Sequence, residues 1–288
     1  MSNNEIRLAV FGGTGEGKTS FVVRATGANL TIGEDADSCT QEMQAASITV
    51  GSKRVIIIDT PGFDDTEGKD MKLFERLTHW LAESRAQMKY LNGVILVQSV
   101  NHVRVPDSER KRTRLLKKII GEAFYNRVAI VTTMWDVSRT NICERGEQNR
   151  GSPEIWGDML AAGATRFRFL NDQQSALEVI RHYAESPSLS VPAPTLLQEE
   201  LVANNGIVKN TSVAAQFQAD VSGKAQELED ILGNMEKNEE TEKVEEYVKT
   251  SRNWLQRLGD MVVKIVKKIV KHVVIDPVMD AIGRCEQM

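Results

Sequence analysis

The sequence has few of the residues that build disulfide frameworks or metal clusters. It contains four histidines and three cysteines, Cys39, Cys143 and Cys285. The cysteines lie far apart and form no metal-ligand pair. This usage is typical of reduced cysteines in a cytoplasmic protein and gives no support to a disulfide scaffold.

The sequence also lacks a strong excess of charge of one sign and a long hydrophobic run. A net charge of −4 gives no general reason to expect nucleic-acid binding. No run of about 18 apolar residues suggests a membrane span. The first ten residues, MSNNEIRLAV, have no basic segment followed by a long apolar one, so we expect no secretory signal. The length of 288 residues suits one large domain, or one domain with an extension.

What the sequence does contain is a glycine-rich stretch, VFGGTGEGKTSF, at residues 10–21. It matches the pattern G-x-x-x-x-G-K-[ST] of nucleotide-binding phosphate loops. A predicted strand at 6–11 enters the stretch and a predicted helix at 20–25 leaves it, as the pattern requires. The alternative is a glycine-rich turn with an unrelated lysine.

Each part of this loop has an expected role. Glycines let successive backbone N–H groups point at phosphate oxygens. Lys18 would reach the β- and γ-phosphates, and the Thr19 hydroxyl would bind Mg²⁺. The residues expected to cradle the phosphates are Gly12, Gly13, Thr14, Gly15, Glu16, Gly17, Lys18, Thr19 and Ser20.

A second motif follows a predicted hairpin with strands at 47–50 and 54–58. The sequence Asp59-Thr60-Pro61-Gly62 matches D-x-x-G. We expect Asp59 near Mg²⁺ and the Gly62 N–H near the γ-phosphate. The alternative is an ordinary strand-to-loop turn. A hairpin between the two motifs is typical of GTPases, where the extra strand is antiparallel, although this is an analogy of fold.

The base-reading segment is predicted after a buried strand at 128–132. Thr133-Met134-Trp135-Asp136 corresponds to the [NT]-K-x-D pattern of GTPases, with methionine in place of lysine. The Asp136 carboxylate would accept hydrogen bonds from guanine N1–H and N2–H₂, a donor pair that adenine lacks. Asp136 as a helix N-cap, and an ATPase in place of a GTPase, are the alternatives.

Together, GGTGEGKT, DSCTQE, DTPGFDD and TTMWD resemble the septin-related GTPases in a fungal-type variant. That group includes the immune-associated nucleotide-binding family and the chloroplast-import receptors. The resemblance covers about residues 5–183. It implies an α/β P-loop GTPase domain: a mostly parallel sheet with one antiparallel strand, and helices on both faces. It also implies GTP or GDP with Mg²⁺.

The resemblance implies roles for three further residues. Thr40 would be the first-switch threonine, which joins the Mg²⁺ shell and contacts the γ-phosphate. Arg104 lies in the arginine box of the family, and Asn171 lies at its base-contacting asparagine position. Ser38 or another nearby hydroxyl is an alternative to Thr40, which could equally be a surface-loop threonine.

The residue after Gly62 indicates slow catalysis. Phe63 stands where Ras-type GTPases carry a glutamine that orients the attacking water. Some members of the resembling family obtain catalytic help from a second protomer. We therefore expect slow hydrolysis by the monomer and a homodimer through the nucleotide face, with Arg104 acting in trans. The alternative is that Arg104 is a solvated or structurally paired arginine.

The last third of the chain is expected to be separate. ESPSLSVPAP at 185–194 divides a GTPase domain at 1–184 from a linker and helical extension at 185–288. A short helix is predicted at 195–201. Residues 252–275 form an amphipathic pattern with six Lys or Arg residues and one acid. Such a helix suits an anionic membrane surface, in a peripheral membrane protein, or packing on the domain or a partner helix. A nucleotide-gated scaffold or membrane module with little turnover is the alternative function.

Overall fold

The computed structural model divides the chain into two compact units. Unit 1 is formed by residues Met1–Arg76 and Lys89–Leu196, and unit 2 by Leu77–Met88 and Leu197–Met288. The structure describes residues 4–28, 43–62, 76–78, 80–84, 89–204, 210–216 and 218–219. Thr40, Phe63 and the basic segment 252–275 lie outside the described residues. The domain boundary at 184/185 stays a prediction.

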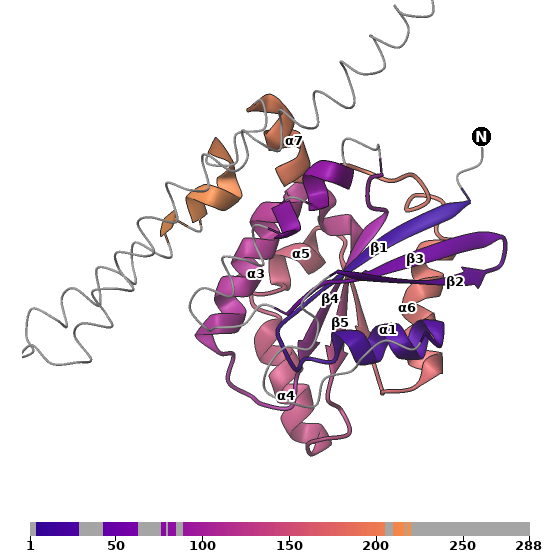
Figure 1. The fold of residues 1–288 in the computed structure, drawn as a ribbon. Coiled ribbons are helices and arrows are strands. Elements are labelled where there is room, and N and C mark those ends of the chain that lie inside the picture. The colour runs from indigo at the N-terminus through magenta and orange to yellow at the C-terminus, as the bar shows by residue number, and fades with distance from the viewer. Residues whose placement is uncertain are drawn as a thin grey trace, which may run out of the picture. The chain divides into compact units, whose positions relative to one another are not determined.

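Unit 1 is built on a six-stranded sheet in the order β2-β3-β1-β4-β5-β6 (Figure 1). The strands are β1 (Glu5–Phe11), β2 (Gln44–Val50), β3 (Lys53–Asp59), β4 (Gly93–Ser99), β5 (Val128–Thr133) and β6 (Thr165–Arg168). Only the pair of β2 and β3 is antiparallel among these named strands. The predicted sheet, mostly parallel with one antiparallel strand, is confirmed.

The strands at the centre of the sheet are almost continuously apolar. All six residues of β5 are buried, as are the first six of β4. Parallel strands with helices on both faces need this composition, because neither side of the strand meets water. β2, at the edge, instead alternates exposed positions with less exposed ones. This difference explains why the hydrophobic runs of the sequence identify the central strands.

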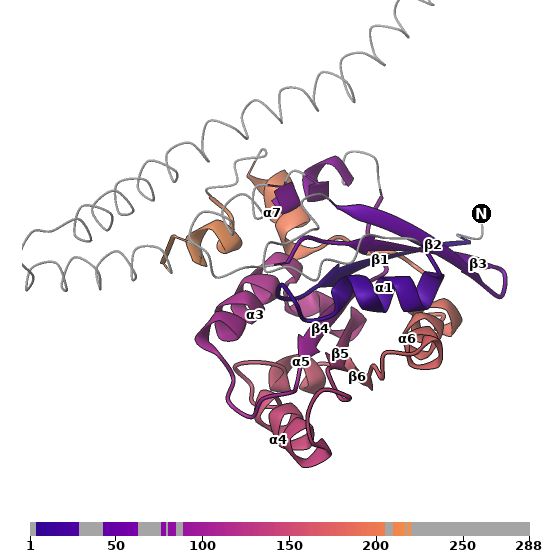
Figure 2. The ribbon, with the colours of Figure 1, turned by 60° about the horizontal axis from the view of Figure 1, so that its bottom comes forward.

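Helices cover both faces of the sheet, as predicted. They are α1 (Lys18–Thr26), α3 (Asp107–Ile120), α4 (Thr140–Arg150), α5 (Gly157–Ala161) and α6 (Gln173–Glu185), with a 3-10 helix at Glu122–Arg127. Figures 1 and 2 show α1 and α6 on one side and α3, α4 and α5 on the other. Phe21 of α1 and Ile180 of α6 join the strands in one buried core.

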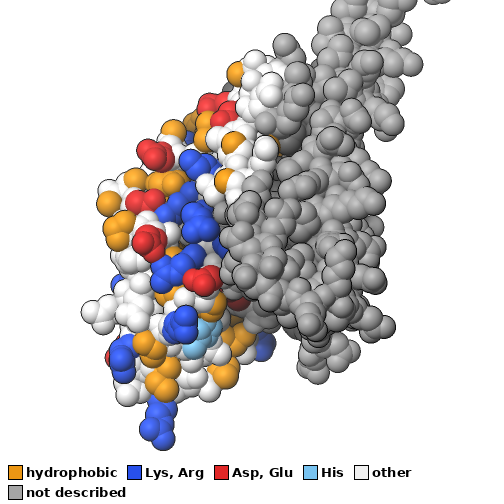
Figure 3. Space-filling model, turned by 90° about the vertical axis from the view of Figure 1, so that its left-hand side faces the viewer, with side chains coloured by type: hydrophobic (Ala, Val, Ile, Leu, Met, Phe, Trp, Pro, Cys, Tyr) orange, Lys and Arg blue, Asp and Glu red, His pale blue; other side chains and the backbone are white. Residues whose placement is uncertain are grey.

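Helix α3 has an amphipathic sequence that suits a helix packed on one face of the sheet. Its buried positions include Leu115, Leu116 and Ile119. Its exposed positions include Lys111 and Lys118. Figure 3 shows Lys and Arg side chains gathered on the face of the molecule that carries α3. The helix therefore turns an apolar stripe to the sheet and a basic stripe outward.

Unit 2 is described for a shorter part of its length. It contains most of α7 (Leu196–Ala203), close to the helix predicted at 195–201. The buried Gln198 side chain donates to the Leu81 carbonyl at 3.0 Å, which joins α7 to the helical residues 80–84. Across the described ranges, no helix has the length and apolar character needed to span a bilayer.

Candidate functional site

The candidate site begins at the loop between β1 and α1. Residues 12–17 form this loop, and Lys18, Thr19 and Ser20 form the first turn of α1. Lys18 is 7% exposed, and its Nζ donates to the Gly13 carbonyl at 2.8 Å. This hydrogen bond holds the Lys18 ammonium group over the phosphate loop, next to the backbone N–H groups at the N-terminus of α1. A helix N-terminus and a fixed cation together suit a phosphate group.

A hydroxyl and a carboxylate meet beside the loop. Thr19 Oγ1 donates to Asp59 Oδ2 at 2.7 Å, across 40 residues of sequence. Asp59 ends β3 and aligns with Val10 in the neighbouring parallel strand. Because the carboxyl ends of adjacent parallel strands share one edge of a sheet, the two motifs that the sequence predicted are brought together.

The Asp59 side chain is completely buried. Burial raises the pKa of its carboxyl, while the hydrogen bond from Thr19 and the charge of Lys18 lower it. Its second oxygen, Oδ1, is buried without a hydrogen-bond partner. Such an atom is costly unless a ligand completes it. Carboxylate and hydroxyl oxygens are the hard ligands that suit Mg²⁺.

Gly62 lies directly against the phosphate loop. A Cβ atom on Gly62 would be 2.3 Å from Thr14 Oγ1 and 2.7 Å from the Thr14 nitrogen, so only glycine fits this approach. Thr14 Oγ1 is also buried without a partner. Among the described residues, three buried side-chain oxygens lack partners, and two of them, on Thr14 and Asp59, belong to these two motifs.

The end of β5 is tied to the same loop. Thr133 Oγ1 donates to the Glu16 carbonyl at 2.8 Å. Met134, in the position usually held by lysine, has a left-handed backbone with φ of 63°. Asp136 follows and is exposed. This turn places the predicted base-reading segment at the same edge of the sheet as the phosphate loop.

Asn171 lies beyond the end of β6, the strand next to β5. It is exposed and has a left-handed backbone with φ of 59°. Arg24 Nε of α1 donates to its Oδ1 at 3.4 Å. The next residue, Asp172, caps α6 by accepting a hydrogen bond from the Ser175 N–H at 2.8 Å. The cap holds the loop that carries Asn171.

Sequence reasoning missed a cluster that supports the Met134–Asp136 turn. The Trp135 indole donates to the Thr132 carbonyl at 3.1 Å, and the Arg168 guanidinium lies 4.1 Å from the centre of the indole ring. Arg168 also pairs with the buried Glu147 at 2.6 Å. No local pattern could reveal this cluster, because its members come from β5, α4 and β6.

Arg104 and Thr40 are the two remaining residues that the sequence predicted for the site. Arg104 is exposed in the segment 101–106 between β4 and α3, which starts at the carboxyl edge of the sheet. Thr40 lies outside the described residues, so its predicted role stays a prediction.

Comparison with known proteins agrees with this geometry. Residues 7–133 match the family model described as 50S ribosome-binding GTPase. In structure, the chain is similar to Toc33 of Arabidopsis thaliana in complex with Mg²⁺ and GMPPNP. That likeness has a TM-score of 0.51 and 14% identity, over 67% of this chain and 87% of Toc33. The fold is that of a P-loop GTPase domain.

Two further comparisons describe the reach of this P-loop GTPase similarity. A dimerisation-deficient mutant of Toc33 matches with a TM-score of 0.52 and 13% identity, over 65% of this chain and 85% of Toc33. GTP-binding protein A of Dictyostelium discoideum is 25% identical over 167 residues, or 57% of this chain. The match covers 36% of that protein, so the chain spans about a third of the length of this curated relative. The structural likeness shows the fold alone.

Proposed function

We propose that the chain binds GTP and GDP with Mg²⁺ and hydrolyses GTP slowly. One observation carries the proposal. The Thr19 hydroxyl donates to Asp59 at 2.7 Å, and Lys18 Nζ donates to the Gly13 carbonyl of the phosphate loop. Beside these contacts, Thr14 Oγ1 within the loop and Asp59 Oδ1 at the end of β3 are buried without hydrogen-bond partners. A triphosphate with a divalent cation supplies the partners that these groups lack. The solved Toc33 complexes with Mg²⁺ and GMPPNP or GDP support the choice of ligand.

Each residue would make its own contribution. Lys18 holds the β- and γ-phosphates, Thr19 and Asp59 hold Mg²⁺, and Thr40 completes the shell. The Gly62 N–H meets the γ-phosphate. Mg²⁺, when bound, neutralises charge on the phosphate oxygens.

Guanine specificity is proposed from the turn after β5. Asp136 would accept from guanine N1–H and N2–H₂, while Met134 would cover one face of the base with an apolar, polarizable side chain. Asn171 would contact the base from the neighbouring loop. The fixed turn around Trp135 supports this assignment, because a site that reads hydrogen bonds needs its groups held in place.

Slow turnover is proposed because Phe63 cannot orient a water molecule as glutamine does. The catalytic set of one chain would then be completed by a second copy across the nucleotide, with Arg104 neutralising the developing phosphoryl charge. The report on atToc33 and psToc159 states that dimerisation is important for their GTPase activity, which supports this arrangement. That structure has a TM-score of 0.50 and 12% identity.

We expect the specific activity of the full chain to rise with protein concentration. In Arg104→Ala the rise should disappear and activity at high concentration should fall to the low-concentration level, with GTP affinity unchanged. The measurement is phosphate release from GTP between nanomolar and high micromolar protein. Arg54→Ala is the matched control, because Arg54 is also exposed but lies at the opposite end of β3 from Asp59. Specific activity that stays constant with protein concentration, and that is the same in the parent and both variants, would contradict the trans mechanism.

A nucleotide-gated module at a membrane is the second candidate. The basic amphipathic pattern of 252–275 and the missing glutamine favour it.

Deleting residues 252–288 should leave nucleotide binding intact, because the nucleotide motifs end before residue 185. The full chain should sediment with anionic liposomes at low salt, weakly at high salt, and the truncated chain should not. Failure of the full chain to sediment at low salt would favour packing of this segment on protein instead.

A further inference from the structure

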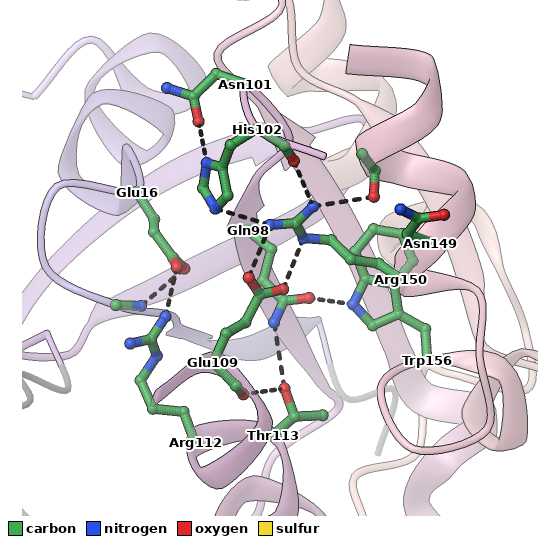
Figure 4. Close-up of polar contacts among 12 residues, drawn as sticks. Glu16, Gln98, Asn101, His102, Glu109, Arg112, Thr113, Asn149, Arg150 and Trp156 are labelled. Carbon is green, nitrogen blue, oxygen red and sulfur yellow. Dashed lines mark hydrogen bonds and ion pairs between the residues drawn. The ribbon is translucent and has the colours of Figure 1, made fainter. Parts of the chain in front are cut away.

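Glu16 is the acidic residue inside the phosphate loop, and its side chain braces the loop. One carboxylate oxygen accepts the Gly13 N–H at 2.8 Å. The other accepts from Arg112 Nη2 of α3 at 2.7 Å. Both side chains are largely buried, with 9% and 17% of their surfaces exposed. Figure 4 shows Arg112 reaching Glu16 from α3. The loop is therefore tied to a helix that sequence reasoning did not connect with it.

The Arg112–Glu16 pair, which we call the brace, acts on Gly13, and Gly13 also holds Lys18. The Gly13 N–H is bonded to Glu16, and the Gly13 carbonyl accepts from Lys18 Nζ. A Cβ atom on Gly13 would lie 2.8 Å from Arg112 Nη2 and 2.9 Å from Glu16 Oε1, so the ion pair rests on this bare backbone. The hydrogen bonds run without a gap from Arg112 through Glu16 and Gly13 to Lys18.

The same face of α3 carries a second, fully buried ion pair. Glu109, one turn before Arg112, accepts from Arg150 of α4 at 2.7 and 2.8 Å. The exposed fractions of the Arg150 and Glu109 side chains are 0% and 2%. Removing one partner of such a pair is costly because the other charge is left buried. The pair fixes α3, and with it the base of the Arg112 side chain.

Arg150 also holds the segment before α3. Its guanidinium donates to the His102 carbonyl at 3.1 Å and contacts His102 Nε2 at 3.0 Å. Arginine has no acceptor atom, so Nε2 accepts and Nδ1 carries the proton that Asn101 Oδ1 accepts at 2.7 Å. Burial and the charge of Arg150 lower the pKa of His102, against a smaller opposing effect of Glu16. The segment that carries Arg104 is thus linked to the phosphate loop through α3.

We propose that Arg112 is a positioning residue for the phosphate loop. Through Glu16 it fixes the Gly13 peptide, and through that peptide it holds Lys18 in place for the phosphates. The affinity for phosphate then depends on the position of α3, so a partner that displaces α3 would release nucleotide. This inference rests on the proposed nucleotide binding.

The test compares two variants of α3 in the full chain. Arg112→Met keeps the apolar stem and removes the charge that reaches Glu16. Arg110→Met is the matched control, because Arg110 pairs with Asp107 and Glu154, away from the loop. Dissociation of labelled GDP with Mg²⁺ should be roughly 10- to 100-fold faster in Arg112→Met, the range that one charge-assisted hydrogen bond gives. Arg110→Met should stay within about twofold of the parent, the size of effect that exposed ion pairs have.

A second variant and a stability measurement separate positioning from folding. Glu16→Gln keeps the shape and one acceptor for the Gly13 N–H, but its NH2 group would face the Arg112 guanidinium and cannot accept from it, so GDP release should become faster by about as much as in Arg112→Met. Adding Arg112→Met to Glu16→Ala should cause no further change in release, because the brace is already absent. Arg110→Met loses only ion pairs with the exposed Asp107 and Glu154, so it should unfold near the temperature of the parent, whereas Arg112→Met leaves the largely buried Glu16 unpaired and should unfold at a lower temperature. Faster GDP release measured well below the unfolding transition of Arg112→Met then reports positioning.

The outcomes distinguish this inference from the function on which it rests. A parent chain that binds neither GDP nor GTP overturns both. A parent that binds GDP, with equal release rates in parent, Arg112→Met and Arg110→Met, overturns only the positioning role. Additive effects of Glu16→Ala and Arg112→Met would also overturn it. If Arg112→Met does not fold, a release rate in Glu16→Ala equal to that of the parent has the same meaning.

Discussion

Replacing Lys18 with alanine should lower the affinity for GTP by on the order of 10²–10⁴-fold. The Lys18 ammonium is held over the loop by the Gly13 carbonyl at 2.8 Å, with 7% of the residue exposed. Each charge-assisted hydrogen bond contributes about 1.5–3 kcal/mol, and two phosphates would each lose one. Every 1.4 kcal/mol is about tenfold in affinity. Calorimetric titration with GTP and Mg²⁺ measures the loss.

The fold should survive this substitution. The alanine variant loses the hydrogen bond from Lys18 to the Gly13 carbonyl, and alanine is a good helix former. Circular dichroism should therefore match the parent. Lys111→Ala, an exposed lysine of α3, serves as the control and should keep full affinity. A folded Lys18→Ala chain that binds GTP like the parent would remove the phosphate-loop assignment.

Asp136→Asn should exchange the preferred base. The asparagine amide offers one acceptor and one donor group where the carboxylate offers two acceptors. Guanine presents two donors, so one of them faces the amide NH2 and the other bonds to an uncharged acceptor, which together cost about 3–5 kcal/mol, or roughly 10²–10⁴-fold in GTP affinity. Xanthine presents N1–H and a C2 carbonyl, which match the amide. The variant should thus gain affinity for xanthosine nucleotides.

The gain in affinity for xanthosine nucleotides is more informative than the loss of affinity for GTP. A variant that merely damages the turn after β5 would bind every nucleotide more weakly. Competition of labelled GDP against GTP and xanthosine triphosphate, in the parent and in Asp136→Asn, separates the two effects. An Asp136→Asn chain with unchanged GTP affinity would show that another residue reads the base.

Much of the fold could be predicted because its signals are local. The strands β1, β3 and β5 each contain an apolar run, and their predicted ranges, 6–11, 54–58 and 128–132, differ from the observed ones by one residue at one or both ends. The phosphate loop and D-x-x-G lie at the ends of such strands, so the parallel topology alone brings Thr19 to Asp59. The edge strand β6 carries no comparable local signal, because it is short and alternately exposed.

The supporting contacts of the site could not be predicted from local signals. Glu16 and Arg112 are 96 residues apart, and Arg150 and Glu109 are 41 apart. Neither spacing belongs to a helix or strand period, so no pattern pairs these residues. The phosphate-loop pattern leaves the Glu16 position free, which made its charge look incidental. A buried charge becomes informative only when the packing shows which opposite charge it must face.

The most direct test of the account is nucleotide binding by the purified full chain. Labelled GDP with Mg²⁺ would be bound and then competed with unlabelled GTP, GDP and ATP. The account predicts saturable binding that GTP and GDP reverse, that ATP does not reverse at equal concentrations, and that weakens when Mg²⁺ is removed. Equal displacement by ATP would contradict the reading of guanine by Asp136, and absence of binding would contradict the nucleotide site itself.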